Sequence, residues 1–186
     1  VPPALAWFSF DDVVQVQNGS GIVEGTWLGS DKSEFADGRL ARALKLDGKT
    51  SAEFVSPWTF DRTNAVTVSA WIKFQGNGAL LSQQEKAPGY RGYDLLIQDG
   101  RPQLHLIHQW PDNALKVRTK EQFPKDQWLH VAATYDGSGK ASGVKLYVNG
   151  RARGVEAGKD QLSASITNAE PFRVGARNGE AFFNGL

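Results

Sequence analysis

The glutamates are the first residues to test for chemistry, because a pair of carboxyl groups is the usual machinery for cleaving a glycosidic bond. A retaining enzyme of this kind needs two carboxyl groups about 5 Å apart, one to attack the sugar and one to transfer a proton. Acids two residues apart on a strand would share one face, yet no two glutamates in this chain lie within four residues of each other. A pair would have to be assembled from separate strands, and nothing in the sequence indicates one.

The other catalytic side chains form no recognisable pattern either. His105 and His108 are three residues apart in a predicted strand, so they point to opposite faces and do not easily share a metal ion. His130 stands beside Trp128 just before a predicted strand, and we interpret it as structural. Cysteine is absent, which excludes thiolate chemistry and disulfides. The sequence also has no Gly-x-Ser-x-Gly elbow and no phosphate-binding glycine loop, so we predict no catalytic residues.

Aromatic residues in a polar setting point instead to a binding surface. Trp110 precedes a proline at the start of a predicted loop with polar neighbours, and the loop QQEKAPGYRGYD adds two tyrosines and an arginine. A sugar needs this combination, because its CH groups stack on an aromatic ring while its hydroxyls form hydrogen bonds. The predicted ligand-binding residues are Trp110, Tyr90, Tyr93, Arg91, His108, Asp112 and Asn113. The alternative is that Trp110 and Tyr93 only seal one end of the fold.

The remaining tryptophans are assigned to packing. Trp7, Trp71 and Trp128 lie inside stretches of alternating polarity that predict strands, and we expect all three in the core. Trp58 follows a proline in SPWTF and is interpreted as a plug within a loop.

Turn residues and alternating polarity predict β-structure along the whole chain. YDLLIQDGRPQLHLI predicts a hairpin with an Asp99-Gly100 turn, and HVAATYDGSGKASGVKLYVNG predicts two strands joined by a mobile tip, residues 137–143, before an Asn149-Gly150 turn. The region from Asn18 to Gly38 is polar and glycine-rich and is interpreted as a long loop. EFADGRLARALKL is the best helical candidate, although Gly38 interrupts it. The remaining predicted strands are 6–10, 43–47, 52–55, 66–74, 79–83, 114–119 and 172–176.

Ten or more strands without a long helix predict one β-sandwich or barrel domain for these 186 residues. The net charge is +1, from 21 basic and 20 acidic residues without a run of one sign, which argues against a nucleic-acid binder. The apolar stretches are too short to span a membrane. The first residues do not form a signal peptide, and methionine is absent, so we expect a fragment of a longer protein.

Five segments carry a family likeness: ALKLDGKTSAEFV, VTVSAWIKF, QWLHVAATYDG, VKLYVNG and FRVGARNG. Their order resembles the laminin-G-like domains of the concanavalin A-like lectin/glucanase superfamily. Two other segments, GYDLLIQDGRPQLHLIHQWPDNALKVRT and YDGSGKASGVKLYVNG, resemble the laminin-G-like module of large planctomycete-type multidomain proteins. The resemblance covers nearly the whole chain and implies an all-β jelly-roll sandwich of two antiparallel sheets, a single domain spanning 1–186. Such domains usually continue past FFNGL into another strand. Either the chain is an excised module that lacks its last strand, or its sandwich is completed differently.

The resemblance also implies a function. We expect a non-catalytic recognition module that binds an oligo- or polysaccharide within a larger exported bacterial protein, extracellular or periplasmic, where its other partners are the domains of its parent. Neither nucleic acid nor a membrane is an expected partner. The fold also hosts protein-interaction or architectural spacer domains and glycoside hydrolases. The related hydrolases carry their acids on one strand as Glu-x-Asp-x-Glu, a run that is absent here. In this fold, the 83–94 loop should lie near the Trp110 loop.

The resemblance implies no required cofactor. It leaves calcium open, since many relatives bind calcium through loop carboxylates. The aspartates in suitable positions are Asp11, Asp12, Asp31, Asp37, Asp47 and Asp136. They form no Asp-x-Asp-x-Asp-Gly run, and Asp47-Gly48 and Asp136-Gly137 are also typical turn sequences. The metal ligands therefore stay unassigned.

Overall fold

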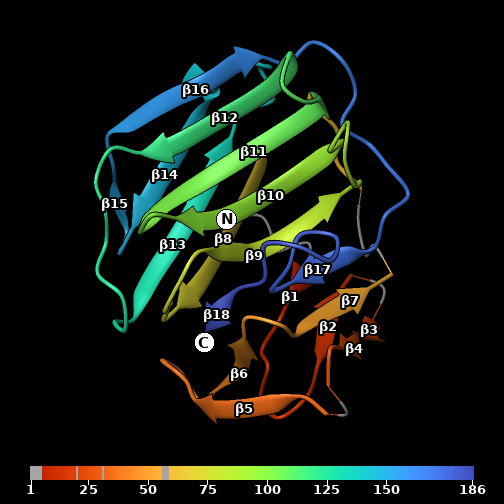
Figure 1. Ribbon diagram of the computed structural model, residues 1–186, viewed down its shortest axis with the longest axis vertical. Coiled ribbons are helices and arrows are strands. Elements are labelled where there is room, and N and C mark those ends of the chain that lie inside the picture. The colour runs from red at the N-terminus through yellow and green to blue at the C-terminus, as the bar shows by residue number, and fades with distance from the viewer. Residues whose placement is uncertain (1–5, 20, 31, 56–58) are drawn as a thin grey trace.

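The computed structural model describes residues 6–19, 21–30, 32–55 and 59–186, and nearly all of their regular structure is β-strand. The strands form two stacked layers with the N-terminal strands at one end (Figure 1). In the described residues, a 3₁₀ turn at Ala141–Gly143 is the one helical segment. That part of the chain contains no helix with the length and apolar character that a membrane span needs. The prediction of an all-β sandwich is confirmed.

The larger layer is an antiparallel sheet of eight strands, which faces the viewer in Figure 1. Its strands are β4 (Thr26–Leu28), β7 (Ser51–Phe54), β9 (Gly78–Gln84), β10 (Gly92–Gln98), β11 (Arg101–Gln109), β12 (Asn113–Thr119), β16 (Val155–Gln161) and β17 (Phe172–Val174). Their spatial order is β16-β12-β11-β10-β9-β17-β7-β4. The sheet therefore joins segments from both ends of the chain.

The smaller layer lies behind the first and has four antiparallel strands in the order β15-β14-β13-β8. These are β8 (Val66–Ile72), β13 (Leu129–Tyr135), β14 (Val144–Val148) and β15 (Arg151–Ala152). Two three-stranded sheets complete the described fold. One contains β1 (Ala6–Trp7), β2 (Gln15–Asn18) and β3 (Gly21–Glu24), and the other contains β18 (Asn184–Gly185), β6 (Arg42–Asp47) and β5 (Glu34–Asp37).

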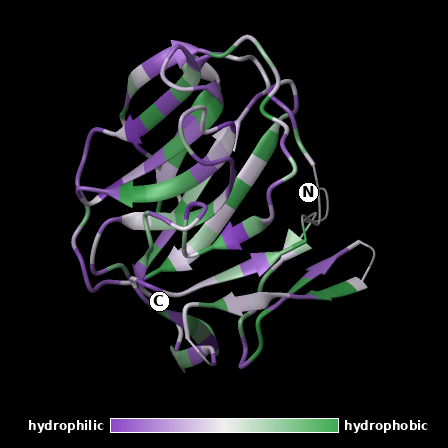
Figure 2. Cartoon of the chain, turned by 45° about the vertical axis from the view of Figure 1, so that its right-hand side comes forward, coloured by the Kyte–Doolittle hydropathy of each residue, from purple (hydrophilic) through white to green (hydrophobic). Residues whose placement is uncertain are grey.

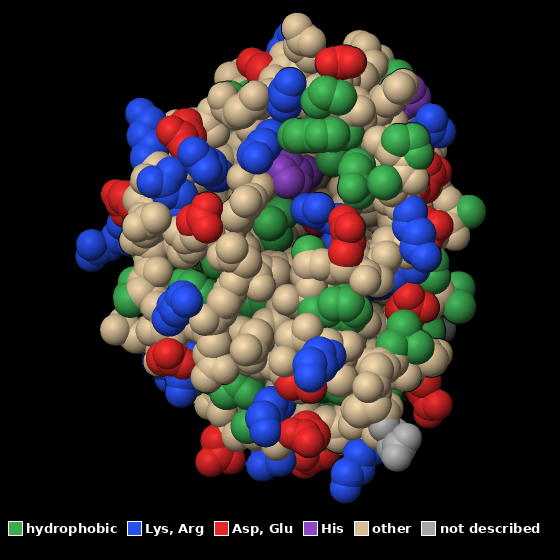
Figure 3. Space-filling view, in the orientation of Figure 1, with side chains coloured by type: hydrophobic (Ala, Val, Ile, Leu, Met, Phe, Trp, Pro, Cys, Tyr) green, Lys and Arg blue, Asp and Glu red, His purple; other side chains and the backbone are tan. Residues whose placement is uncertain are grey.

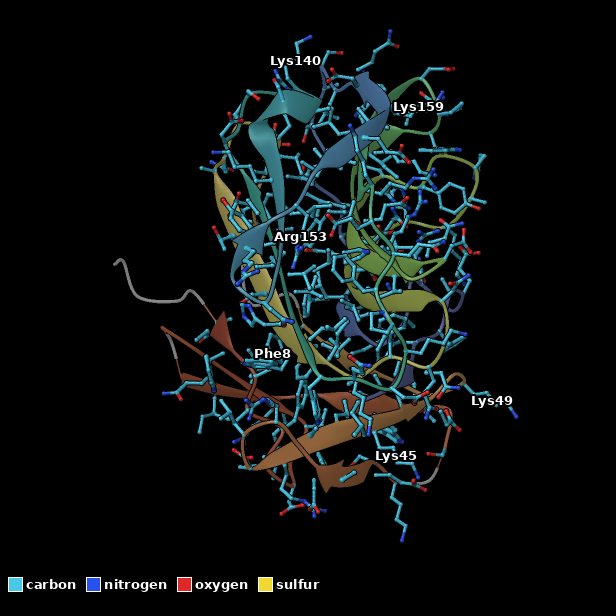
Figure 4. The ribbon with its side chains drawn as sticks, turned by 90° about the vertical axis from the view of Figure 1, so that its left-hand side faces the viewer. Phe8, Lys45, Lys49, Lys140, Arg153 and Lys159 are labelled. Atoms are coloured by element: carbon cyan, nitrogen blue, oxygen red, sulfur yellow. The ribbon has the colours of Figure 1, made fainter. Side chains whose placement is uncertain are left out.

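The two layers enclose the core because each strand points apolar side chains inward at every second position. Leu95 and Leu106 from the larger sheet form one buried cluster with Val131 and Leu146 from the smaller sheet. Figure 2 shows the resulting bands of hydrophobic and hydrophilic residues along the strands, and Figure 4 shows the side chains that fill the space between the layers. Burial of these inner faces fixes which residues are left on the outside.

Both predicted hairpin turns are confirmed. Asp99 and Gly100 have φ values of 53° and 70°, and Asn149 and Gly150 have φ values of 53° and 74°. These left-handed conformations are the ones that Asp-Gly and Asn-Gly adopt readily in tight hairpins. The predicted strands 43–47, 52–55, 66–74, 79–83, 114–119, 131–135, 144–148 and 172–176 are also present, with ends that differ by a few residues.

The N-terminal predictions were less accurate. The region from Asn18 to Gly38 is not a long loop, because it contains β3, β4 and β5. EFADGRLARALKL is a hairpin of β5 and β6, in which Phe35 pairs with Leu44 across the strands and both contact the core. In β6 the buried residues Leu44 and Leu46 alternate with the exposed Lys45, which is the period of two of a strand that packs on one face. Of the predicted strand 6–10, only Ala6–Trp7 forms a strand.

Two of the tryptophans expected in the core are exposed. Trp7 is 63% exposed and Trp71 is 41% exposed, whereas Trp128 is half-buried. In β8 the alternation gives the inner face to Ile72 and its even-numbered neighbours, so Trp71 must point outward, where its ring lies 5.3 Å from that of His130. Trp58 lies outside the described residues.

The predicted mobile tip between β13 and β14 lies against the fold instead of projecting from it. The backbone N–H of Gly139 donates to the hydroxyl of the buried Tyr135 at 2.6 Å, and that of Ala141 donates to the Asp160 carboxylate at 2.6 Å. Ala141 and Gly143 are themselves buried. The polar composition of residues 137–143 reflects their role in turns and does not indicate mobility.

The two hairpin glycines provide a matched test of the turns. Gly150→Ala should lower the free energy of unfolding by about 1–2 kcal/mol, the cost of a left-handed conformation for an L-residue, since nothing lies within 4 Å of the added Cβ. Gly100→Ala should cost more, because its Cβ would also lie 3.0 Å from the carbonyl oxygen of Phe123. Urea unfolding measures both, and equal losses would contradict the turn geometry.

Candidate functional site

One row of polar side chains crosses the outer face of the larger sheet from edge to edge. In the order of the strand pairings, the row consists of Lys159, Lys116, His105, Asp94, Ser82, Arg173, Glu53 and Thr26. Side chains alternate between faces along a strand, and the adjacent Leu106, Leu95 and Phe54 belong to the core. The row therefore points away from the core. Figure 3 shows this face, with a histidine between basic and hydrophobic side chains.

A buried ion cluster around Asp94 occupies the centre of the row. Oδ1 of Asp94 lies 2.9 Å from Nδ1 of His105, and Oδ2 lies 2.7 Å from Nε of Arg177. Burial acts to raise the pKa of the Asp94 carboxyl, but the interactions with His105 and Arg177 outweigh it and hold this pKa below its ordinary value. Arg177 follows β17, so the cluster fastens the segment after β17 onto the face of the sheet.

The Asp94–His105 pair does not complete a catalytic triad. In a triad, the second imidazole nitrogen faces a serine or cysteine nucleophile. Here that nitrogen, Nε2 of His105, lies 3.0 Å from Nε2 of Gln103 and accepts a hydrogen bond from the amide. Ser82, the neighbour of Asp94 in the row, donates its hydroxyl proton to the carbonyl of Ala176 at 2.8 Å. Both groups are engaged in holding the fold.

The carboxylates of the row are too far apart to act as a hydrolytic pair. Asp94 and Glu53 are separated by three strand spacings, which is about 14 Å at about 4.8 Å per spacing. Glu53 is also bound to Nε of Arg173 at 2.6 Å. Retaining hydrolysis needs about 5 Å between the two carboxyl groups and inverting hydrolysis no more than about 9.5 Å, so this pair fits neither chemistry.

Trp110 stands directly beside the basic half of the row. Its ring centroid lies 5.9 Å from that of His105, and the ammonium groups of Lys116 and Lys159 each lie 5.9 Å from the Trp110 ring. The Trp110 backbone N–H donates to the carbonyl of Gly89 at 2.9 Å, which confirms that the 83–94 loop lies next to the Trp110 loop. Trp110 is half-buried, so the residue is partly accessible from outside.

The structure does not bring all the predicted binding residues to this face. Tyr93 is 4% exposed and lies in the core, with its ring 4.4 Å from that of Phe60, because its position in β10 points inward. We therefore leave Tyr93 out of the candidate site. Tyr90 and Arg91 lie in the loop that contacts Trp110, and Asp112 is exposed in the turn after it.

The other two predicted residues hold a neighbouring segment in place. His108 donates from Nδ1 to the carbonyl of Ser165 at 2.6 Å. Asn113 donates to the hydroxyl of Ser163 at 3.0 Å and accepts from the Ser163 backbone N–H at 2.9 Å. The segment after β16 is thereby attached to the end of the sheet. Nδ1 of His108 and the side-chain amide of Asn113 are occupied within the protein, so we assign both residues a supporting role.

His105, Lys116 and Lys159 belong to this face although the sequence did not predict it, and the same holds for two buried glutamines. Gln84 and Gln103 are fully buried, yet the side-chain N and O of Gln84 and the side-chain O of Gln103 have no hydrogen-bond partner among the described residues. Buried amides are normally satisfied by protein, ordered water or ligand. Both lie at outward-facing positions, two residues along the strand from a member of the row: Gln84 from Ser82 and Gln103 from His105.

A hollow continues this face toward its other edge. Glu53 and Arg173 of the row line it, together with Lys49 and Lys86, and its volume is about 330 Å³. That volume lies at the lower end of the range for ligand pockets. The outer face thus combines an aromatic half and a hollow half, separated by the segment that Arg177 fastens down.

The aspartates considered for calcium are engaged in turns and ion pairs. The backbone N–H of Lys49 and the side chain and backbone of Thr50 bond to Asp47 and lower its pKa, and Ser138 does the same for Asp136. Asp11, Asp12 and Asp37 all contact Arg42. Asp31 lies outside the described residues. Within the rest, no three His, Asp or Glu side chains are grouped so as to hold a metal ion. Calcium binding stays an untested prediction.

Residues 46–186 match the sequence profile of the concanavalin A-like lectin/glucanases superfamily, in its laminin G group. The chain belongs to this superfamily. The resemblance to this superfamily is thereby confirmed, together with its jelly-roll β-sandwich. No curated protein sequence matches the chain.

Solved structures share the same fold. Domain 4 of AbnA, a GH43 extracellular arabinanase from Geobacillus stearothermophilus in complex with arabinotriose, has a TM-score of 0.70 at 23% identity, over 98% of this chain and 87% of that one. The CBM40 of the Ruminococcus gnavus IT-sialidase has a TM-score of 0.53 at 19% identity, over 67% and 72% of the two chains. The botulinum neurotoxin serotype C1 binding domain has a TM-score of 0.64 at 11% identity, over 98% and 43%. At these identities the likeness establishes the fold alone.

The ion cluster predicts a specific pH dependence. Asp94→Asn should lower the free energy of unfolding by about 3 kcal/mol at pH 7, because it breaks the buried ion pairs of Asp94 with His105 and Arg177. The folded-state pKa of Asp94 is lower than its reference value of 3.8, so its stabilising effect is present above about pH 4 and is lost as the pH falls through the folded pKa.

Urea unfolding at pH 7 and at pH 3 measures this effect. The difference between wild type and Asp94→Asn should be smaller at pH 3, while Asp112→Asn, at an exposed position, should match wild type at both. An equal difference at the two pH values would show that Asp94 does not act through its charge.

Proposed function

We propose that this chain is a non-catalytic carbohydrate-binding module that holds a saccharide on the outer face of its larger sheet, around Trp110. The observation that carries the proposal is the half-buried Trp110 ring beside a row of polar side chains. An aromatic ring offers a stacking surface for the CH groups of a sugar, and the surrounding polar groups offer hydrogen bonds to its hydroxyls.

Further support comes from the AbnA domain, which has the same fold and was solved with arabinotriose. We also propose that the module serves a larger exported protein and that binding needs no metal.

A second candidate rests on the opposite face of the sandwich. Trp71 is 41% exposed on the smaller sheet, and Arg39 lies over its ring at 5.3 Å from the centroid. Exposed aromatic side chains with an arginine are typical of protein contact sites. If the chain is an interaction or spacer module, Trp71 is the side chain we expect to contact its partner.

Replacing each of the two tryptophans by alanine separates these candidates. Trp110→Ala should weaken binding of arabinotriose, or of the best ligand from a glycan array, by about 30-fold, which corresponds to the about 2 kcal/mol of an aromatic hot spot. Trp71→Ala is the matched control and should leave the affinity unchanged. Isothermal titration measures the affinity, and calorimetric melting shows that both variants are folded.

The glycan proposal fails if no glycan is bound, or if Trp110→Ala binds as tightly as wild type. Loss of binding in Trp71→Ala, with Trp110→Ala intact, would transfer the site to the smaller sheet.

The absence of catalysis is tested on the bound glycan. We expect no release of reducing ends during prolonged incubation, because Asp94 and Glu53 are too far apart to act together. Addition of EDTA should leave the affinity unchanged if no metal takes part. Product release that disappears in Glu53→Gln would overturn the non-catalytic assignment, and loss of binding in EDTA that calcium restores would establish a metal site.

A further inference from the structure

The basic half of the polar row contains an unusual like-charge pair. Lys116 on β12 and Lys159 on β16 are direct cross-strand partners on the same face. Side chains in such positions have Cβ atoms about 4.5–5.5 Å apart, and like charges there are destabilising. Both ammonium groups approach the same ring, that of Trp110, at 5.9 Å from its centroid. This distance is near the outer limit of a cation–π contact, so the ring only weakly offsets the repulsion.

The acids near these lysines are engaged elsewhere. Asp94 is bound by His105 and Arg177. Glu156, on the same strand as Lys159, is bound by Arg101 and Arg118. Asp160 accepts the backbone N–H of Ala141. Among the described residues, neither Lys116 nor Lys159 has an acidic partner within ion-pair distance.

Two arginines in and beside the row are already neutralised. Arg173 binds Glu53 and Glu170, and Arg177 binds Asp94 and Glu180. The whole chain has a net charge of only +1, so its overall field does not attract anions strongly. Any preference for an anion must therefore arise locally, where two uncompensated ammonium groups stand beside an aromatic ring.

We propose that the saccharide carries a carboxylate, as in a uronic or sialic acid, and that this carboxylate binds between Lys116 and Lys159 while the sugar ring stacks on Trp110. This inference rests on the carbohydrate-binding function proposed above and names the class of sugar. One carboxylate has two oxygens and can accept from both ammonium groups. A bound carboxylate would offset the repulsion between the two lysines, whereas a neutral sugar would not. The site should therefore bind a charged sugar more tightly than a neutral one.

Two pairs of probes isolate the charge of the ligand. Polygalacturonate is compared with its fully methyl-esterified form, and sialyllactose with lactose, so that each pair shares a sugar scaffold and differs in its carboxylate. Wild type should bind at least one acidic probe about tenfold more tightly than its neutral counterpart, measured by affinity electrophoresis and titration at low salt. The preference should shrink as salt is added, because exposed charges are screened.

Two double variants isolate the charge of the protein. Lys116→Gln with Lys159→Gln should remove the preference for the acidic probe and leave the melting temperature equal or higher, since the repulsion is gone. Lys45→Gln with Lys140→Gln removes the same total charge at exposed sites on other elements (Figure 4) and should keep the preference.

The outcomes separate the two proposals. The acidic-sugar inference falls if neither acidic probe is preferred, or if the preference survives in the Lys116/Lys159 double variant. If neutral glycans are bound equally well and Trp110→Ala abolishes that binding, the module still binds carbohydrate but does not select for charge. If no probe of either kind is bound, the proposed function itself falls.

Discussion

Burial of the inner faces of two stacked sheets is the constraint on which everything else in this protein depends. Side chains along a strand alternate strictly, so a strand that buries Leu95 or Leu106 must turn Asp94 or His105 outward. A slip of one residue in any pairing would send these polar groups into the core. The polar row across eight strands is therefore a direct result of hydrophobic packing on the other side of the same sheet.

The ion cluster converts this flat row into a shaped surface. Asp94 is fully buried, and a buried carboxylate is tolerated only when cations and donors compensate for its lost hydration. One of those cations, Arg177, comes from the segment after β17, so that segment must lie on the sheet. The cluster thus orders a loop, separates the aromatic half of the face from its hollow half, and holds the imidazole of His105 beside Trp110.

Much of the fold could be predicted from the sequence, whereas the candidate site could be predicted only in part. Asp99-Gly100 and Asn149-Gly150 located their hairpins because the turn chemistry is local. The alternation in VTVSAWIKF already placed Trp71 opposite the core residues, but the size and apolar character of tryptophan argued for burial. The hairpin that contains Phe35 and Leu44 showed no clear period of two in the sequence. The segments on which it packs are distant in the chain, and they decide which of its faces is buried.

For the site, sequence position identified Trp110 and its neighbouring loop. It could not identify Lys116 or Lys159, because two lysines 43 positions apart in the sequence become neighbours only through strand pairing.

The strand that carries Lys159, β16, lies at the edge of the larger sheet. Its outer edge is a place where a strand of another molecule can pair. Its charged side chains and the irregular pairing beside Val117 discourage such sheet-to-sheet polymerisation. The charge of Lys159 thus also disfavours self-association through this edge.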